Sequence, residues 1–434
     1  MSSRITQLAQ SVLANTTKLD QHQQNNNHPS PSFDATGPRD FGITDADVEK
    51  SRLDAIESAT ELIDLLQGPV APLRPFYNGA SLQAISRWSI ASKVPRDGDI
   101  SYTELAKQCG GISELDVRRI LRYAMVYHRL FCEPRKGFVA HSLASLQLSE
   151  EPHLAGLLWL MGDSSYASYP HIVPALENFK DQEPHHAPWS LAFHSSKSMY
   201  DAMQDQPILA SNFANAMASF ASFPDSTIHQ ASHALPGMEI LHYYPWSNLS
   251  GSQSAIHIVD IGGSTGDKTL PLVEALPNLS LTVQDLPQTI VGAEQSIPEH
   301  LRPRVNFMAY DFFTPQTRIA DAYILKHCLH NWPDHYCVRI LRNQIPVLRP
   351  GARIIIIDHI LPEPGTMGLL VEKKIRALDM LMLTNHNARE RELEDFKTLI
   401  KQADSRFQIG HIHQSQPSSA DFPTGAIEVI WPGN

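Results

Sequence analysis

The sequence predicts an α/β fold in which a mostly parallel sheet follows a long helical region. From Ile256 onward, short apolar runs alternate with helix-like segments, a pattern typical of parallel sheets with helices on both faces. Before that point helical patterns dominate, and residues 80–148 have the element order of a winged helix. The 434 residues are enough for two or three domains, and a hydrophobic content of 42% is enough for a large core.

The composition excludes several classes of partner and location. A formal net charge of -11 argues against a nucleic-acid or anionic-membrane partner. No apolar run approaches the roughly 20 residues of a membrane span, and the N-terminus lacks a secretory signal pattern. Cys109, Cys132, Cys328 and Cys337 show no disulfide-framework spacing. A cytoplasmic protein with free thiols is therefore expected.

Residues 1–40 are predicted to be a flexible N-terminal segment with one short helix. Ile5, Leu8, Val12 and Leu13 share one helical face, and a helix this short is stable only when packed on the body or on a second subunit. The low-complexity run Gln21–Ser32 is expected to be a loop or a disordered link.

Residues 41–150 are predicted to form a helical, winged-helix domain. A first helix is expected at 45–67. Three further helices are expected at 82–92, from Ser101 to Gly110 and at 114–131, and a small β wing is expected at 133–141. Ser101 is a candidate N-cap with Glu104 at capping-box spacing. A winged helix by itself suggests DNA binding. Because Glu114 and Asp116 open the third helix and the chain is acidic, dimerisation is favoured.

Residues 151–250 are predicted to be a helical linker that supplies the substrate pocket. Large apolar side chains recur at helical spacing here: Trp159, Met161, Trp189, Phe193, Phe213, Met217, Phe220 and Phe223. Phe213 and Met217 are the candidate substrate contacts, and ordinary core packing is the alternative for every member of the set.

Residues 251–434 are predicted to be the catalytic domain. The expected strands are Ile256–Val259, Leu281–Gln284, Val305–Ala309, Ala322–Leu325, Arg353–Ile357 and Ala426–Ile430, and the expected helices include Val338–Val347 and Glu392–Gln402. Ligands of such sheets bind at the carboxyl ends of the strands. Asp260, Asp285, Asp311 and Lys326 all fall at or just past these ends.

The run from Ile256 to Pro271, I-H-I-V-D-I-G-G-S-T-G-D-K-T-L-P, predicts a strand that ends in a glycine turn. Such a turn brings bare backbone close to a nucleotide-type ligand. Asp260 would lie beside a ligand cation such as a methionine ammonium, and Asp285 would accept ribose hydroxyls. Glycine turns also bind dinucleotides or merely close βα connections, but the spacing G-G-x-x-G lacks the full pyrophosphate fingerprint.

The segment Tyr323–Asp334, Y-I-L-K-H-C-L-H-N-W-P-D, makes a resemblance specific. Together with D-I-G-G-S-T-G, D-L-P at Asp285, Y-D-F-F at Asp311 and the late A-R-E-R-E, it resembles plant- and fungal-type class I O-methyltransferases. That group includes caffeate and sterigmatocystin O-methyltransferases, and the resemblance covers nearly the whole chain. It implies a Rossmann-like methyltransferase domain, a winged-helix dimerisation domain, a homodimer, S-adenosylmethionine as cofactor and a small aromatic or polyketide-type secondary metabolite as acceptor.

The resemblance also implies the cofactor contacts. The methionine part would be held by one acid and the glycines, the ribose by the second acid with its neighbour, and the adenine by a third acid with two aromatic side chains. In that order these residues are Asp260, Gly262, Gly263 and Gly266; Asp285 and Leu286; Asp311, Phe312 and Trp332; Lys326 would lie near the cofactor.

His330 matches the family's general base, with Asp358 and Glu390 as the acids beside it. Met382 matches a residue that packs against the acceptor ring. These residue types suit the reaction, because a phenol has a pKa near ~10 and a histidine near ~6.5, so imidazole can remove the hydroxyl proton. A carboxylate partner fixes the tautomer and stabilises the imidazolium.

Asn331 departs from the family pattern, which has Asp directly after the base histidine. Asn331 is itself a candidate substrate contact. The departure leaves an alternative open: a methyltransferase-fold pericyclase or dehydratase of a polyketide–alkaloid pathway. There the sulfonium would act electrostatically without being consumed, and His330 and Lys326 would serve as acid, base or hydrogen-bond donor.

No metal site is predicted. His327, Cys328 and His330 cluster, as do His185 and His186, but neither group has a spaced partner pair and Lys326 would repel a cation. A nicotinamide dehydrogenase is disfavoured by Asp260 before an incomplete glycine fingerprint. A DNA-binding regulator with a vestigial cofactor domain is the remaining non-enzymatic reading.

Overall fold

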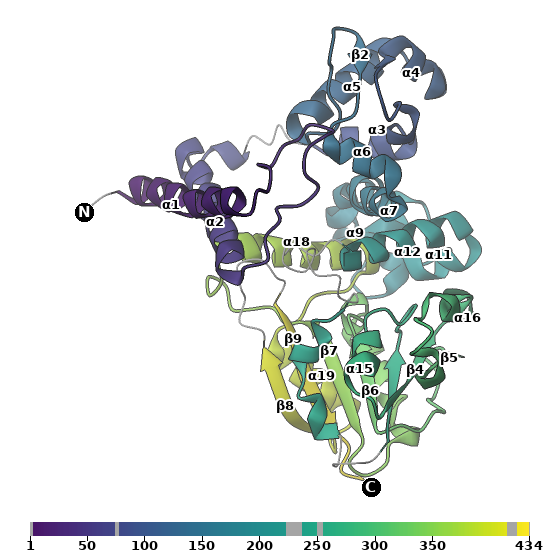
Figure 1. Ribbon diagram of the computed structural model, residues 1–434. Coiled ribbons are helices and arrows are strands. Elements are labelled where there is room, and N and C mark those ends of the chain that lie inside the picture. The colour runs from purple at the N-terminus through teal and green to yellow at the C-terminus, as the bar shows by residue number, and fades with distance from the viewer. Residues whose placement is uncertain (1–2, 74–77, 223–236, 250–254, 415–422, 434) are drawn as a thin grey trace. The chain divides into compact units, whose positions relative to one another are not determined.

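The computed structural model describes residues 3–73, 78–222, 237–249, 255–414 and 423–433 (Figure 1). Contacts divide the chain into two compact units. One unit consists of Met1–Asn178 and Ala187–Ser232, and the other consists of Phe179–His186 and His233–Asn434. Among the described residues, none of the helices combines the length and apolar character that crossing a bilayer needs.

Helices α1 (Arg4–Asn25) and α2 (Ala46–Gln67) pack against each other in the first unit (Figure 1). The Asp45 carboxylate caps α2 by accepting the N–H groups of Asp47 and Val48, so the helix predicted at 45–67 is confirmed. The predicted loop at Gln21–Ser32 is wrong for its first five residues, which continue α1. Glutamine is a good helix former, and Gln23 is buried, so packing supports the end of α1.

The segment after α2 contains α3 (Ala80–Arg87), α4 (Tyr102–Gln108), α5 (Glu114–Tyr127) and α6 (Leu143–Glu150). Strands β1 (Ile100–Ser101) and β2 (Phe138–Val139) pair antiparallel, so the expected wing contributes one strand to a short ribbon. The Ser101 hydroxyl accepts the Glu104 N–H, as its predicted N-cap role requires. Helix α5 ends four residues before the predicted boundary, where Arg129 and Phe131 adopt positive φ.

The remainder of the first unit is helical. Its elements are α7 (Pro152–Leu158), a π-helical turn (Trp159–Ser164), α8 (Ser165–Ser168), α9 (Ile172–Asn178), α10 (Pro188–Ala192), α11 (Met199–Asp205) and α12 (Pro207–Ser222). Helices α7 and α12 pack closely at Gly156, where a Cβ would lie 2.6 Å from the Ala216 nitrogen. Glycine therefore sets the distance between these two helices.

The second unit is built on a seven-stranded sheet in the order β5-β4-β3-β6-β7-β9-β8. Its strands are β3 (Ile256–Ile261), β4 (Leu279–Asp285), β5 (Val305–Ala309), β6 (Ala322–Lys326), β7 (Arg353–His359), β8 (Gln408–Gln414) and β9 (Thr424–Ile430). All pairings are parallel except those of β9 with β7 and β8. The predicted mostly parallel α/β sheet is confirmed.

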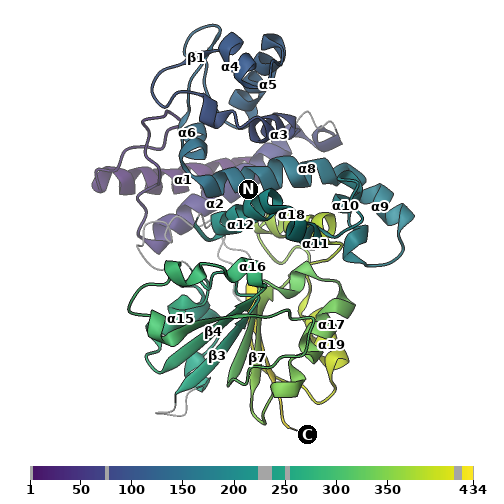
Figure 2. The ribbon, with the colours of Figure 1, turned by 90° about the vertical axis from the view of Figure 1, so that its right-hand side faces the viewer.

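The helices of this unit are α14 (Ile240–Tyr243), α15 (Leu270–Ala275), α16 (Pro287–Ile290), α17 (Asp334–Arg342), α18 (Leu369–His386) and α19 (Leu393–Ala403). In Figure 2, α15 lies on one side of the strands and α17 and α19 on the other. Successive residues of β3 bury on opposite faces: Ile258 packs with Leu272, and Val259 packs in the cluster that contains Phe396. Burial on both faces explains the continuous apolar runs of the central strands.

Candidate active site

The turn after β3 lies against the end of β4. The Gly262 and Gly263 N–H groups donate to the Gln284 carbonyl at 2.8 and 3.1 Å. Gly262 and Gly266 have φ of 70° and 81°, the left-handed region that glycine adopts without strain. At Gly263 a Cβ would lie 2.4 Å from an Asp260 carboxylate oxygen. Gly263 therefore allows the turn to pack directly against the Asp260 carboxylate.

The two acids of the turn have different surroundings. Asp260 is 2% exposed and accepts the Thr269 hydroxyl at 2.7 Å, and burial raises the pKa of its carboxyl to about 7. Asp285 accepts the N–H groups of Ser264 at 2.9 Å and Leu286 at 2.7 Å, one on each carboxylate oxygen. The Thr289 side chain also hydrogen-bonds to this carboxylate, and a carboxylate, with about four acceptor positions, has capacity left for a ligand hydroxyl.

Aromatic rings lie beside the same turn. A Cβ on Gly262 would be 3.6 Å from the Phe312 ring, and the Phe312 and Trp332 rings meet edge to face with centroids 5.8 Å apart. The Asp311 carboxylate accepts the Phe313 N–H at 2.9 Å and so fixes the connection that carries Phe312. The structure brings these three predicted adenine contacts to one place next to the glycines.

Lys326 ends β6 beside the turn, and its side chain is only 5% exposed. Its ammonium lies 3.4 Å from the carboxylate of Glu239, the residue before α14. Burial lowers the pKa of Lys326, and the Glu239 charge opposes this effect. Glu239 is not predicted from the sequence, because nothing local in G-M-E-I-L-H points to a partner 87 positions away.

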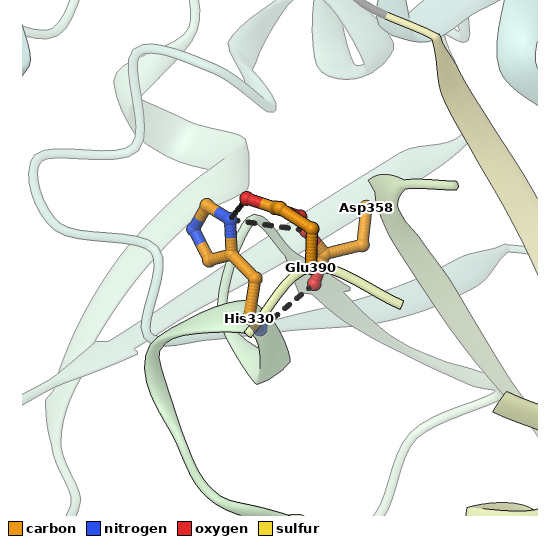
Figure 3. Close-up of side chains that lie close together, drawn as sticks. All are labelled: His330, Asp358 and Glu390. Carbon is orange, nitrogen blue, oxygen red and sulfur yellow. Dashed lines mark hydrogen bonds and ion pairs between the residues drawn. The ribbon is translucent and has the colours of Figure 1, made fainter. Parts of the chain in front are cut away.

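His330, Asp358 and Glu390 come together from three separate elements (Figure 3). His330 lies in a 3₁₀ turn after β6, Asp358 near the end of β7, and Glu390 after α18. The His330 Nδ1 atom is 2.8 Å from Glu390 Oε1 and 3.6 Å from Asp358 Oδ1. Asp358 Oδ2 also accepts the His330 backbone N–H at 3.2 Å. In Figure 3 the second ring nitrogen, Nε2, points away from both acids.

The two acids make His330 a stronger base than free histidine. Burial by itself lowers the pKa of the imidazole, but the charges of Asp358 and Glu390 outweigh burial and raise the pKa to about 9. Burial raises the pKa of Glu390 above its usual range, although His330 opposes that shift. The proton between Nδ1 and Glu390 is therefore held tightly, and proton exchange with a ligand is left to Nε2.

The same three side chains offer one ligand atom each within 4.8 Å of one another, a grouping that also suits a metal ion. The 2.8 Å separation of His330 Nδ1 and Glu390 Oε1 is that of a hydrogen bond. The guanidinium of Arg391 is close enough to lower the pKa of His330. A proton is favoured over a metal ion in this position.

Arg391 holds the turn that carries His330. Its guanidinium is completely buried and donates to Asp334 Oδ1 at 2.8 and 3.0 Å, to the Leu329 carbonyl at 2.9 Å and to the Trp332 carbonyl at 2.7 Å. Leu329 and Trp332 flank His330 in the chain. Arg391 is a site residue that was not predicted, although the motifs A-R-E-R-E and W-P-D contain both partners of the ion pair.

The predicted substrate contacts are only partly brought together. Met382 is buried on α18, which packs against the His330 turn, and the Asn331 side chain donates to the His327 carbonyl at 3.3 Å. Phe213 and Met217 lie on α12 of the other compact unit, Phe213 packed against a small core cluster and Met217 38% exposed. Their contact with a substrate stays a prediction.

Several known proteins are similar to this chain. The profile of the O-methyltransferase domain family matches residues 176–406. The chain is 43% identical to "O-methyltransferase pyvH" of Aspergillus violaceofuscus, with 100% of each protein aligned. It is 42% identical to the "Grayanic acid biosynthesis cluster O-methyltransferase" of Cladonia grayi, over 99% of this chain and 88% of the relative. The crystal structure of OxaC in complex with SAH and oxaline has the same fold, with a TM-score of 0.70 and 21% identity over 98% and 99% of the two chains.

Replacing Arg391 by methionine should destabilise the second unit more than the same change at its neighbour. Arg391→Met leaves two carbonyls and part of Asp334 without a buried donor, so we expect a loss of about 3–5 kcal/mol in the free energy of unfolding. Arg389 is 40% exposed, so Arg389→Met should cost no more than about 1 kcal/mol. Urea denaturation of both variants measures the difference, and equal losses would contradict the role of Arg391.

Proposed function

Because the chain belongs to the O-methyltransferase family, we propose that His330 is the general base that prepares a hydroxyl group for methylation. The protein is an S-adenosylmethionine-dependent O-methyltransferase. The acceptor is a hydroxyl of a small aromatic or polyketide-type secondary metabolite. One observation carries the proposal: both acids, Asp358 and Glu390, approach the Nδ1 side of His330 and leave Nε2 for the acceptor.

The residues around the glycine turn fit the cofactor. A Cβ at Gly263 would lie 2.4 Å from Asp260 and one at Gly266 would lie 2.9 Å from Val283, so these glycines let the turn pack tightly on its neighbours. The Asp285 carboxylate offers oxygen acceptors to the ribose hydroxyls. Leu286 donates its N–H to Asp285 and so fixes that carboxylate. We propose that Phe312 and Trp332 hold the adenine. When bound, S-adenosylmethionine supplies a methyl group on a positively charged sulfur.

His330 would take the hydroxyl proton at Nε2. A base of pKa about 9 is well matched to a phenol, whose pKa is near ~10, so the transfer is nearly balanced in free energy. The imidazolium that forms is stabilised by Glu390 at 2.8 Å and Asp358 at 3.6 Å. Those hydrogen bonds also fix the ring, so that positioning contributes to the rate.

We further propose that residues 41–150, within the helical first unit, form a winged-helix homodimerisation domain and that the protein is fungal. Large apolar side chains on α1 and α2 are exposed in the single chain, with Leu13 at 68%, Ile63 at 54% and Leu66 at 65%. A second subunit would cover them. All four cysteines are free, which suits the reducing cytoplasm.

Replacing His330 by alanine should reduce methyl transfer by about 100-fold or more, the typical contribution of a general base. The assay follows both S-adenosylhomocysteine and product mass, with labelled cofactor and a panel of phenolic and enolic acceptors. His300→Ala is the matched control, because His300 is 64% exposed in the same unit and pairs with Glu274. Normal turnover by His330→Ala would refute the base. Product formed without S-adenosylhomocysteine would instead support the pericyclase or dehydratase alternative raised by Asn331.

Replacing Glu390 by glutamine should shift the pH profile of kcat/KM to lower pH. The base works when deprotonated, so the wild-type rate should rise with pH until the pKa of about 9 is passed. Removing one carboxylate charge lowers the pKa of His330, so the rising limb should move down while the maximal rate falls. Glu394→Gln changes a glutamate whose side chain is 78% exposed and should leave the limb in place. An unmoved or upward limb in Glu390→Gln would exclude Glu390 as the partner of the base.

A further inference from the structure

Lys326 and Glu239 form an ion pair whose two members differ in exposure. The Lys326 side chain is 5% exposed and that of Glu239 is 35% exposed. Their charged atoms are 3.4 Å apart, longer than the roughly 2.7–2.9 Å of a strong charge-assisted hydrogen bond. Lys268 is near enough for its charge to lower the pKa of Lys326. A buried lysine with one loose partner and a second cation nearby has capacity for another anion.

The position of Glu239 is determined by its neighbours. Gly237 has a φ of 84°, and a Cβ there would lie 2.8 Å from the Lys268 Cα atom and carbonyl oxygen. Only glycine allows this segment so close to the end of the turn. Ile240 is completely buried, and its carbonyl accepts the Trp246 indole N–H at 2.8 Å. Glu239 is thus held at the turn by packing on both sides.

The other acids beside the turn have partners of their own, and among them Asp267 accepts the Thr265 hydroxyl at 3.0 Å. Asp260 is 2% exposed and hydrogen-bonded to Thr269, and the backbone of Gly263 lies directly over its carboxylate. Asp285 accepts two backbone N–H groups on the β4 side. Among the described acids around the turn, Glu239 combines partial exposure with a position next to Lys326.

We propose that Lys326 and Glu239 bind the aminocarboxyl end of the cofactor, with Lys326 facing its carboxylate and Glu239 facing its ammonium. The assignment rests on the proposed function and moves the ammonium partner from Asp260 to Glu239. A ligand that carries an ammonium and a carboxylate on the same carbon offers an opposite charge to each member of the pair. Lys326 and Glu239 would then each have two oppositely charged partners, one another and the ligand. Asp260 then acts as a support for the turn.

The experiment compares two ligands that differ only in this end. S-adenosylhomocysteine carries the aminocarboxyl group, whereas 5′-methylthioadenosine has the same nucleoside and sulfur without it. Calorimetric Kd values are measured for full-length wild type, Glu239→Gln and Glu274→Gln. Glu239→Gln should weaken S-adenosylhomocysteine about tenfold or more and change methylthioadenosine less than about twofold. Glu274 is a 47% exposed glutamate of the same unit, so its variant should leave both ligands unchanged.

A third ligand separates the two charges. Decarboxylated S-adenosylmethionine keeps the ammonium and lacks the carboxylate. Glu239→Gln should weaken it, whereas Lys326→Met should weaken S-adenosylhomocysteine and spare the decarboxylated ligand.

Two results overturn the assignment. Equal losses for S-adenosylhomocysteine and methylthioadenosine in Glu239→Gln would mean that the ion pair only holds the fold, and unchanged affinity for both would mean that Glu239 does not face the ligand. Failure of the wild type to bind S-adenosylhomocysteine is a different outcome, because it rejects the proposed function itself.

Discussion

The buried guanidinium of Arg391 is the constraint on which the site depends. A charge taken out of water is tolerated only if its donors are all bonded, and Arg391 meets this requirement with Asp334 and two backbone carbonyls. Asp334 neutralises the buried charge, and the two carbonyls belong to Leu329 and Trp332, so the same guanidinium also fixes the turn containing His330. Glu390 directly precedes Arg391 in the chain. The hydrogen bonds of the Arg391 side chain therefore also position Glu390 relative to His330. The hydrogen bond between His330 Nδ1 and Glu390 Oε1 is 2.8 Å long.

Charge balance links this frame to the chemistry. Asp358 and Glu390 both lie within 3.6 Å of one imidazole, and they raise the pKa of His330 to about 9. Such surroundings favour a positive charge nearby, and the cofactor of the family is a sulfonium. In methyl transfer His330 gains a proton as the cation is consumed, so the net charge of the region does not change. Reactions that conserve buried charge avoid the large cost of solvating a new ion in a low dielectric.

Much of the fold was predictable from local patterns, and the long-range partners were not. The central strands bury both faces and therefore read as continuous apolar runs, and the glycines after β3 mark the turn. Strand β8 was missed because Q-I-G-H-I-H-Q is polar and lies at the sheet edge, where half the side chains meet solvent. His330, Asp358 and Glu390 came from family resemblance, and their approach to within 3.6 Å depends on topology. Arg391 and Glu239 act on partners 57 and 87 positions away, so no local signal distinguished them from surface charges.

Asn331 departs from the family pattern, and the geometry gives the departure a physical meaning. Its amide donates to the carbonyl of His327, a residue with a φ of 46° whose backbone needs support. A carboxylate cannot donate that bond. A carboxylate at the position directly after His330 would also raise the pKa of that imidazole further, which would leave less of the base deprotonated at neutral pH. Asn331 limits the negative charge and secures the turn, so its presence is consistent with a working base and favours methyl transfer over loss of that chemistry.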